Sequence, residues 1–290
     1  MLGQFHSLQA QQPFTYTGYM ENLTPLNPAY SLLHPTGGFD LAARKQWVGV
    51  EGAPSTLLAD AWLPLGSDRK TTAGLVLLHD NVAVEHQTAA DAFLAKSVQI
   101  SAVDYIGVSI NAGFRRYVTE FASLDPDDMA LNEDIRENVV NAGFGVMVYG
   151  KNEDDEIKYY AGLSVPRVSL RTLGGGSVNG KRHLKDQFYI AGGFYKNLTD
   201  DIKIKPAVLI SHSSNLPLQA DFSTMVYLKD KLGLGFNYRS NNEAAGVFSV
   251  MVKENFRIGY SYQLGFGAGR IGNFGNDTHE IGLSLKINDY

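Results

Sequence analysis

The residue types that carry most protein chemistry occur in this chain, but their spacing assembles no catalytic or metal-binding motif. None of the seven histidines forms an HxH or HxxxH pair, and there is no cysteine to supply a thiolate, a disulfide or a nucleophile. The serine and histidine in SHSS (211–214) are direct neighbours, which point to opposite faces of a strand. No G-x-S-x-G nucleophile elbow occurs. We therefore expect no enzyme, no cofactor and no metal site.

One glycine-rich motif and two acidic runs also suggest chemistry that their context does not support. GAGRIG (267–272) matches G-x-G-x-x-G, but a dinucleotide site needs a helix after it, and NFGNDTHEIGLSLK predicts a turn and a strand. The acidic runs at 125–128 and 152–156 lack the alternating ligands and the glycine of a calcium loop. We expect both runs to be solvated loops.

Composition points to a β-rich chain that does not bind nucleic acid. The sequence holds 30 glycines, 15 tyrosines and 15 phenylalanines, and only 19% of its residues are charged, against about 25% in ordinary globular proteins. The net charge is −5 and no block of five or six like charges occurs, so we expect no nucleic-acid partner. No apolar run approaches the roughly 18 residues of a membrane helix.

Alternation of apolar and polar residues recurs along most of the chain and predicts β-strands. Ile106, Val108 and Ile110 share one face of a predicted strand, for example, and Gly107 and Ser109 share the other. About fourteen such segments follow Gly38, and many have near the 9–11 residues of a membrane-spanning strand. They lie at 38–48, 55–65, 72–84, 86–98, 102–119, 137–150, 156–168, 185–198, 202–212, 216–229, 231–241, 243–253, 255–265 and 278–288.

The chemistry of the two faces favours a membrane barrel over a soluble β-protein. The polar face is mainly Gly, Ser and Asn with an occasional Arg, which suits a crowded lumen, whereas a soluble sheet usually shows Lys, Glu and Thr to solvent. A closed barrel leaves no sheet edge, and an even strand number fits bacterial outer-membrane barrels. We therefore predict an all-β fold, a transmembrane antiparallel β-barrel of about 14 strands over 38–290. Alternation alone also permits a soluble, surface-exposed β-adhesin.

The stretch from Asn27 to Thr56 breaks the pattern with charges and a proline. We expect Arg44 and Gln46 on one face of the first strand and Lys45 and Trp47 on the other. One basic side chain would then face the lumen, while the second would snorkel to the membrane interface beside the tryptophan. The segment before the barrel, residues 1–37, begins no strand and is expected to fill the lumen as a hatch.

At this point the chain also resembles a known family. NLTPLNPAYS, RKQWVGVEGAPST, INAGFRRY, YYAGLSVP, GLGFNYR, IGYSYQLG and THEIGLSLKI follow one another in the order seen in the PorP/SprF family of outer-membrane proteins. The Asn-Pro-Ala element is also similar to the hatch of FadL-type transporters. The matching positions are Asn27, Pro28, Ala29, Tyr30, Gln46, Trp47, Gly52, Ala53, Pro54, Thr278, His279 and Glu280.

The resemblance implies a barrel in the outer membrane of a Gram-negative bacterium that serves the type IX secretion and gliding machinery. It implies a role in exporting or anchoring cargo such as large adhesins, with other periplasmic and outer-membrane components and outer-membrane lipid as partners. Each matching position also has a purely structural interpretation as a plug, a packing residue, a turn or a strand start. A second function stays open, that of a hatch-gated, FadL-like transporter of small hydrophobic solutes.

Overall fold

The computed structural model is an antiparallel β-barrel, described over residues 16–34, 36–120, 134–173, 184–214, 216–266 and 277–287. Its strands, apart from the two-residue β9, run for 8 to 17 residues. They are β1 (Gly37–Lys45), β2 (Ser55–Leu65), β3 (Thr71–Val82), β4 (Glu85–Gln99), β5 (Asp104–Thr119), β6 (Ile135–Lys151), β7 (Ile157–Thr172), β8 (Gln187–Phe194), β9 (Lys196–Asn197), β10 (Ile202–Ser213), β11 (Gln219–Leu228), β12 (Leu232–Arg239), β13 (Glu243–Lys253), β14 (Phe256–Gly265) and β15 (Thr278–Ile287).

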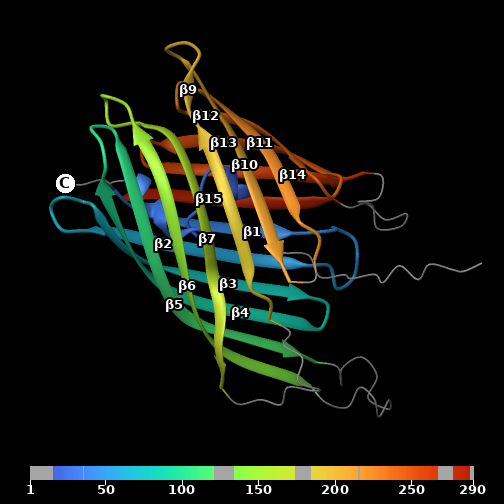
Figure 1. The fold of residues 1–290 in the computed structure, drawn as a ribbon. Coiled ribbons are helices and arrows are strands. Elements are labelled where there is room, and N and C mark those ends of the chain that lie inside the picture. Colours follow the sequence, from blue (N-terminus) through green and yellow to red (C-terminus); the bar gives the residue numbers. More distant parts are fainter. Residues whose placement is uncertain are drawn as a thin grey trace, which may run out of the picture.

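The sheet closes on itself because its first and last strands pair. β1 is hydrogen-bonded to β15 from Gly37–Ile287 to Lys45–His279, and consecutive strands pair around the rest of the circle (Figure 1). β9 continues β8 in the same register against β10. Pro206, which has no N–H to give to a ladder, lies on β10 at this interruption. Counted this way, the described residues form a closed barrel of fourteen strands without a free edge.

The predicted fold class and strand number are therefore confirmed. The main differences lie in length, since β6 begins two residues earlier than expected and β7 continues four residues further. The glycine-rich motif at 267–272 and the acidic run at 125–128 lie outside the described residues. The second acidic run, 152–156, is a turn between β6 and β7, as expected.

No helix in the described part of the chain is long and apolar enough to cross a membrane.

Side chains alternate between an apolar outside and a polar inside. On β5, Ile110 is 66% exposed on the outer face, whereas its neighbours Ser109 and Asn111 are 3% and 6% exposed in the lumen. Leucine, isoleucine, valine and phenylalanine occupy exposed outer positions on strands all around the barrel. This arrangement is the reverse of a soluble protein and matches an apolar band in contact with lipid.

The two ends of the barrel differ in the length of their connections. At one end, here called the short-turn end, the connections are 66–70, 100–103, 152–156, 198–201, 229–231 and 254–255. At the opposite, long-loop end, the connections include 46–54, 120–134, 173–186 and 266–277. β1 begins and β15 finishes at the short-turn end.

Residues 16–34, here called the internal segment, lie inside the barrel (Figure 1, blue). The segment contains two 3-10 helices, η1 (Thr17–Met20) and η2 (Pro28–Leu33). η1 contacts β11, β14 and β15, and η2 contacts β3 to β6, so the segment crosses from one wall to the other. Its apolar side chains form the main buried cluster together with inward residues of the strands.

The outward face gives a first prediction about membrane stability. Ile110→Lys places a charge near the middle of β5 on the lipid side, and we expect it to lower the free energy of unfolding in a bilayer by about 2–4 kcal/mol. Ile110→Leu, which keeps the face apolar, is the matched control. Denaturant titration of the refolded barrel in lipid vesicles measures both, and equal stability of the two variants would contradict a lipid-facing position.

Candidate functional site

The Asn27-Pro28-Ala29-Tyr30 element begins η2 and ties the internal segment to the barrel wall. The Asn27 side-chain oxygen accepts the Ala29 N–H at 3.1 Å and so caps η2, while Pro28 occupies the first turn. The Asn27 amide nitrogen donates to the carbonyls of Val146 at 3.2 Å and Leu163 at 3.4 Å, on β6 and β7. The Asn27 side chain thus both caps η2 and binds it to the barrel wall.

Small residues on the strands leave the space that Asn27 occupies. A Cβ on Gly145 of β6 would lie 2.2 Å from the Asn27 side-chain oxygen, and one on Gly162 of β7 would lie 3.0 Å from its nitrogen. Both glycines are close-approach positions, because any larger residue would displace the docked amide. Gly145 and Gly162, which lie on the polar lumen face, therefore leave room for the internal segment.

Lys205 of β10 holds the other half of the segment from inside a cage of tyrosine rings. Its ammonium nitrogen donates to the Met20 carbonyl at 2.7 Å and lies 3.3 Å from the Tyr30 hydroxyl. It also lies 5.1 to 5.8 Å from the ring centres of Tyr30, Tyr160 and Tyr195. Lys205 is 2% exposed and forms no ion pair with a described residue. The rings therefore replace a carboxylate as its partner.

Glu280 of β15 connects the internal segment to the strands that close the barrel. Its carboxylate accepts the backbone N–H groups of Thr17 at 3.0 Å and Gly18 at 2.6 Å. It also lies 3.6 Å from the Arg44 guanidinium, directly across the β1–β15 ladder. Thr278 is buried beside it, whereas His279 on the outer face contacts the Tyr260 hydroxyl at 2.7 Å.

The remaining predicted site residues lie away from the segment, in the 46–54 connection at the long-loop end. The prediction that Gln46 and Trp47 belong to the first strand is wrong: β1 ends at Lys45, and Trp47 has a left-handed φ of 46°. Such a φ is uncommon for a residue with a side chain and ends the strand. Arg44 does point into the lumen and Lys45 outward, as expected.

Backbone and side-chain hydrogen bonds fold this connection back on itself. The Gln46 N–H donates to the Pro54 carbonyl at 2.9 Å, and the Lys45 ammonium donates to the buried Ala53 carbonyl at 3.0 Å. Gly52 has a φ of 71° and accepts the Ala83 N–H at 2.8 Å. Gly52, Ala53 and Pro54 therefore make a turn, while Trp47 stays half-buried beside an exposed Val48.

Buried polar side chains fill the lumen on the long-loop side of the internal segment. Arg239 pairs with Asp221 at 2.8 Å and Glu243 at 3.1 Å, and Gln263 bridges from Glu243 at 2.7 Å to Arg44 at 3.2 Å. A second group joins Arg167 to Asp91 at 2.6 Å and Asn141 to the same carboxylate at 2.5 Å. Removing one partner of such a buried pair typically costs 3–5 kcal/mol. These groups make a rigid polar layer.

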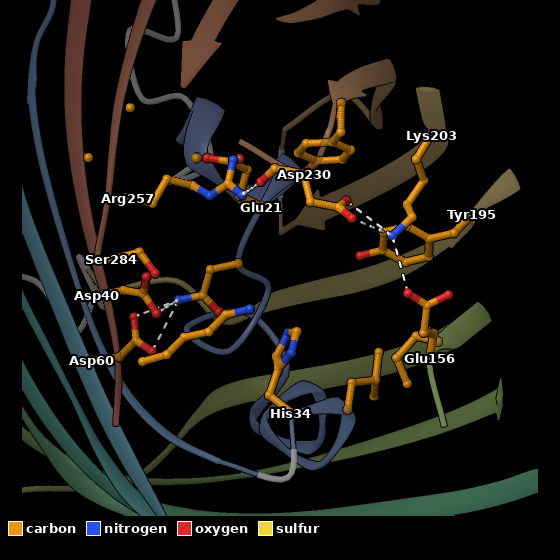
Figure 2. Close-up of a pocket in the computed structure, with 18 of the residues that line it drawn as sticks. Glu21, His34, Asp40, Asp60, Glu156, Tyr195, Lys203, Asp230, Arg257 and Ser284 are labelled. Carbon is orange, nitrogen blue, oxygen red and sulfur yellow. Dashed lines mark hydrogen bonds and ion pairs between the residues drawn. The ribbon is translucent and has the colours of Figure 1, made fainter. Parts of the chain in front are cut away.

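The short-turn half of the lumen is hollow. A cavity of about 620 Å³ lies there between the barrel walls and the internal segment (Figure 2). Glu21, Asn22 and His34 contribute to it from the internal segment. Its walls carry Asp40 and Asp60 on one side and Lys203 and Tyr195 on another, as Figure 2 shows.

Sequence patterns did not indicate which lumen side chains contact one another in this site. Alternation predicts that Asp40, Asp60, Lys203 and Lys205 face inward, but it does not indicate which of them meet. Their neighbours are set by the closure of the barrel and by the path of the internal segment. Of the twelve predicted positions, 27–30 belong to the internal segment and Glu280 of β15 binds that segment, whereas the predicted residues of 46–54 lie at the long-loop end.

The fold and its contents define a class, an outer-membrane-type β-barrel that carries part of its own N-terminal region in the lumen. The family model described as "Type IX secretion system membrane protein PorP/SprF" matches residues 8–285 of the chain. The chain therefore belongs to the PorP/SprF family. Membership and fold together point to a membrane protein of the secretion system that works without catalysis. No curated protein sequence matches the chain.

Solved structures with the same architecture include a hydrocarbon channel. A "TodX deltaS2S3 mutant monoaromatic hydrocarbon channel" has a TM-score of 0.53 and 11% identity, with 93% of this chain and 94% of that chain covered. The TodX deltaS2 mutant has a TM-score of 0.51 at 12% identity, covering 93% and 94%. The Pseudomonas putida toluene transporter TodX scores 0.49 at 10% identity, covering 92% and 93%. At this identity the likeness concerns the fold.

The close approach of Asn27 gives a prediction about segment docking. Gly145→Ala should displace the Asn27 amide and weaken docking by about 1–3 kcal/mol, as overpacked sites do. Ser31→Cys supplies a single buried thiol in a chain without cysteine, and its labelling rate by a maleimide in detergent reports segment release. A loss of about 1.4 kcal/mol raises the labelled fraction about tenfold.

The matched control is Gly282→Ala, also on a lumen face, where the nearest atom to a Cβ is 4.0 Å away. Heat-modifiable gel migration confirms that each barrel is folded. Equal labelling of the two variants would show that Asn27 docking does not depend on a small residue at position 145.

The tyrosine cage gives a second prediction. Lys205→Met keeps the apolar stem but removes the ammonium that binds Met20 and the rings, so we expect faster labelling of the Ser31→Cys reporter in a folded barrel. Lys203→Met on the same strand removes only ion pairs at the exposed rim, which contribute little. If Lys203→Met accelerates labelling as much as Lys205→Met, the cage does not specifically hold the segment.

Proposed function

We propose that this protein is a non-enzymatic component of the type IX secretion machinery that assists the export or surface anchoring of cargo proteins. The observation that carries this proposal is the family match over residues 8–285. We place the barrel in the outer membrane of a Gram-negative bacterium. Its partners are then other periplasmic and outer-membrane components of the machinery and the secreted cargo, such as large adhesins.

The filled lumen supports a role through protein partners. The ion pairs around Arg239 and the docked internal segment lie at successive levels of the described lumen. A solute that crossed the membrane here would have to displace both. We assign residues 16–34 as a plug, with Asn27 to Tyr30 and Glu280 as the residues that fasten it.

The lengths of the connections support one orientation in the membrane. Outer-membrane barrels have short periplasmic turns and longer extracellular loops. The short-turn end, with the cavity, then faces the periplasm, and the 46–54 connection faces the cell surface. Gln46 and Trp47 are then placed to contact cargo, and the cavity is placed to meet periplasmic components.

A mild-detergent pull-down of the tagged protein from native outer membranes, read by mass spectrometry, tests this function. We expect secretion components and a large surface protein in stoichiometric yield. Trp47→Ala should reduce recovery of the surface protein severalfold, whereas Val48→Ala, on the same connection, should not. Recovery of the folded barrel alone would contradict the secretion role.

A second candidate function is a hatch-gated transporter of small hydrophobic solutes. The docked internal segment and the fold shared with the TodX mutants favour it. Uptake of toluene into vesicles with a lipopolysaccharide outer leaflet tests it. Flux through the wild-type barrel that is blocked by substitutions at Asn27 to Tyr30 would place transport first, and flux equal to that of protein-free vesicles would exclude it.

A further inference from the structure

The cavity in the short-turn half has the size and the shape of a binding site. Its volume of about 620 Å³ falls within the roughly 300–1,000 Å³ that is usual for ligand sites. The internal segment, held by Glu280, Asn27 and Lys205, bounds it on the long-loop side. A ligand therefore enters and leaves from the short-turn end.

One wall of the cavity carries two carboxylates, Asp40 and Asp60, and the Lys286 side chain of β15 lines the same cavity. Asp40 and Asp60 are directly opposite each other on β1 and β2. Both accept from the same Asn22 amide nitrogen, at 3.2 Å for Asp40 and 2.9 Å for Asp60, and neither forms an ion pair with a described residue. Like charges in directly opposite positions destabilise a sheet. Lys286 offsets one of these two charges, so a further cation beside the pair would reduce the repulsion that is left.

The opposite wall carries lysines and carboxylates together. Lys203 of β10 pairs with Asp230 at 3.1 Å and Glu156 at 3.5 Å, from two different turns (Figure 2). Lys158 also lines the cavity, and it forms no ion pair with a described residue. Glu156, Asp230 and Asp155 also line this side, so its charges are mixed, whereas the directly opposed like charges lie at β1–β2.

Aromatic side chains also line the cavity, and its rim is polar and hydrogen-bonded. The aromatic residues are Trp62, Tyr195 and Tyr227. At the rim, Arg257 binds Glu21 of the internal segment at 3.4 Å and the Asp230 carbonyl at 3.1 Å. A partly apolar interior inside a polar, hydrogen-bonded rim is the usual anatomy of a protein–protein contact.

We propose that this cavity binds an extended peptide segment of a periplasmic partner protein, with a lysine or arginine side chain of that segment beside the Asp40–Asp60 pair. The aromatic wall covers the apolar stem of such a side chain, as these long residues require. Lys158, which forms no ion pair with a described residue, meets an acidic group or a peptide carbonyl further along the segment. The site deepens the proposed secretion function and rests on it, since that function supplies the periplasmic partner.

Photo-crosslinking from inside the cavity tests this inference. Gly282→Cys places one thiol on the wall, in a chain without cysteine and with 4.0 Å of free space. It is labelled with benzophenone maleimide in native outer membranes and irradiated. Gly246→Cys is the matched control, because Gly246 lies on the exposed outer side of β13 with nothing within 4 Å.

We expect Gly282→Cys, and not Gly246→Cys, to cross-link to one periplasmic protein within a peptide that contains a basic residue. Asp40→Asn combined with Asp60→Asn should reduce this product at least tenfold while the barrel stays heat-modifiable. A synthetic copy of the cross-linked peptide should compete, and its Lys→Gln or Arg→Gln form should not. Adducts with lipid alone, no adduct, or a product that survives the Asp substitutions would overturn the proposal.

The pull-down separates this inference from the function on which it rests. If secretion components co-purify but the cavity gives no specific cross-link, the secretion role stands and the peptide site is wrong. If no secretion component co-purifies, the secretion role itself fails.

Discussion

The ladder between β1 and β15 is the interaction on which the rest of the structure depends. Lipid offers no hydrogen-bond partner to a strand edge, so a membrane sheet is stable only when it closes. Nine paired positions, from Gly37–Ile287 to Lys45–His279, make this closure. They also place Arg44 opposite Glu280, and hence create the first anchor of the internal segment. The pairing of β1 with β15 therefore both closes the barrel and helps to hold the internal segment in the lumen.

The lumen is divided into two chemically different halves. Toward the long loops, Arg239 and Arg167 form buried ion pairs with Asp221 and Asp91. Toward the short turns, charges face each other across a cavity. The internal segment separates the halves and is fastened to both sides of the barrel, by Asn27 to β6 and β7 and by Glu280 to β15.

Much of the barrel could be predicted from sequence, because alternation is a local property that persists through each strand. β2, for example, was predicted with the observed bounds, and so were β13 and the end of β14. The end of β1 was missed because Trp47 adopts a left-handed backbone conformation that its residue type disfavours. The Lys205 cage could not be predicted, since Tyr30, Tyr160 and Tyr195 meet only after non-local closure.

The position of Glu280 also has a consequence for the order of assembly. The carboxylate that binds the Thr17 N–H lies 263 residues further along the chain, on β15, which pairs with β1 to close the barrel. Contacts of such sequence separation form late, because the entropy of closing the loop must be lost first. Thr17 and Gly18 therefore gain this anchor only after β15 has joined the sheet. A barrel that lacks β15 would lose both the pairing that closes it and one attachment of the internal segment.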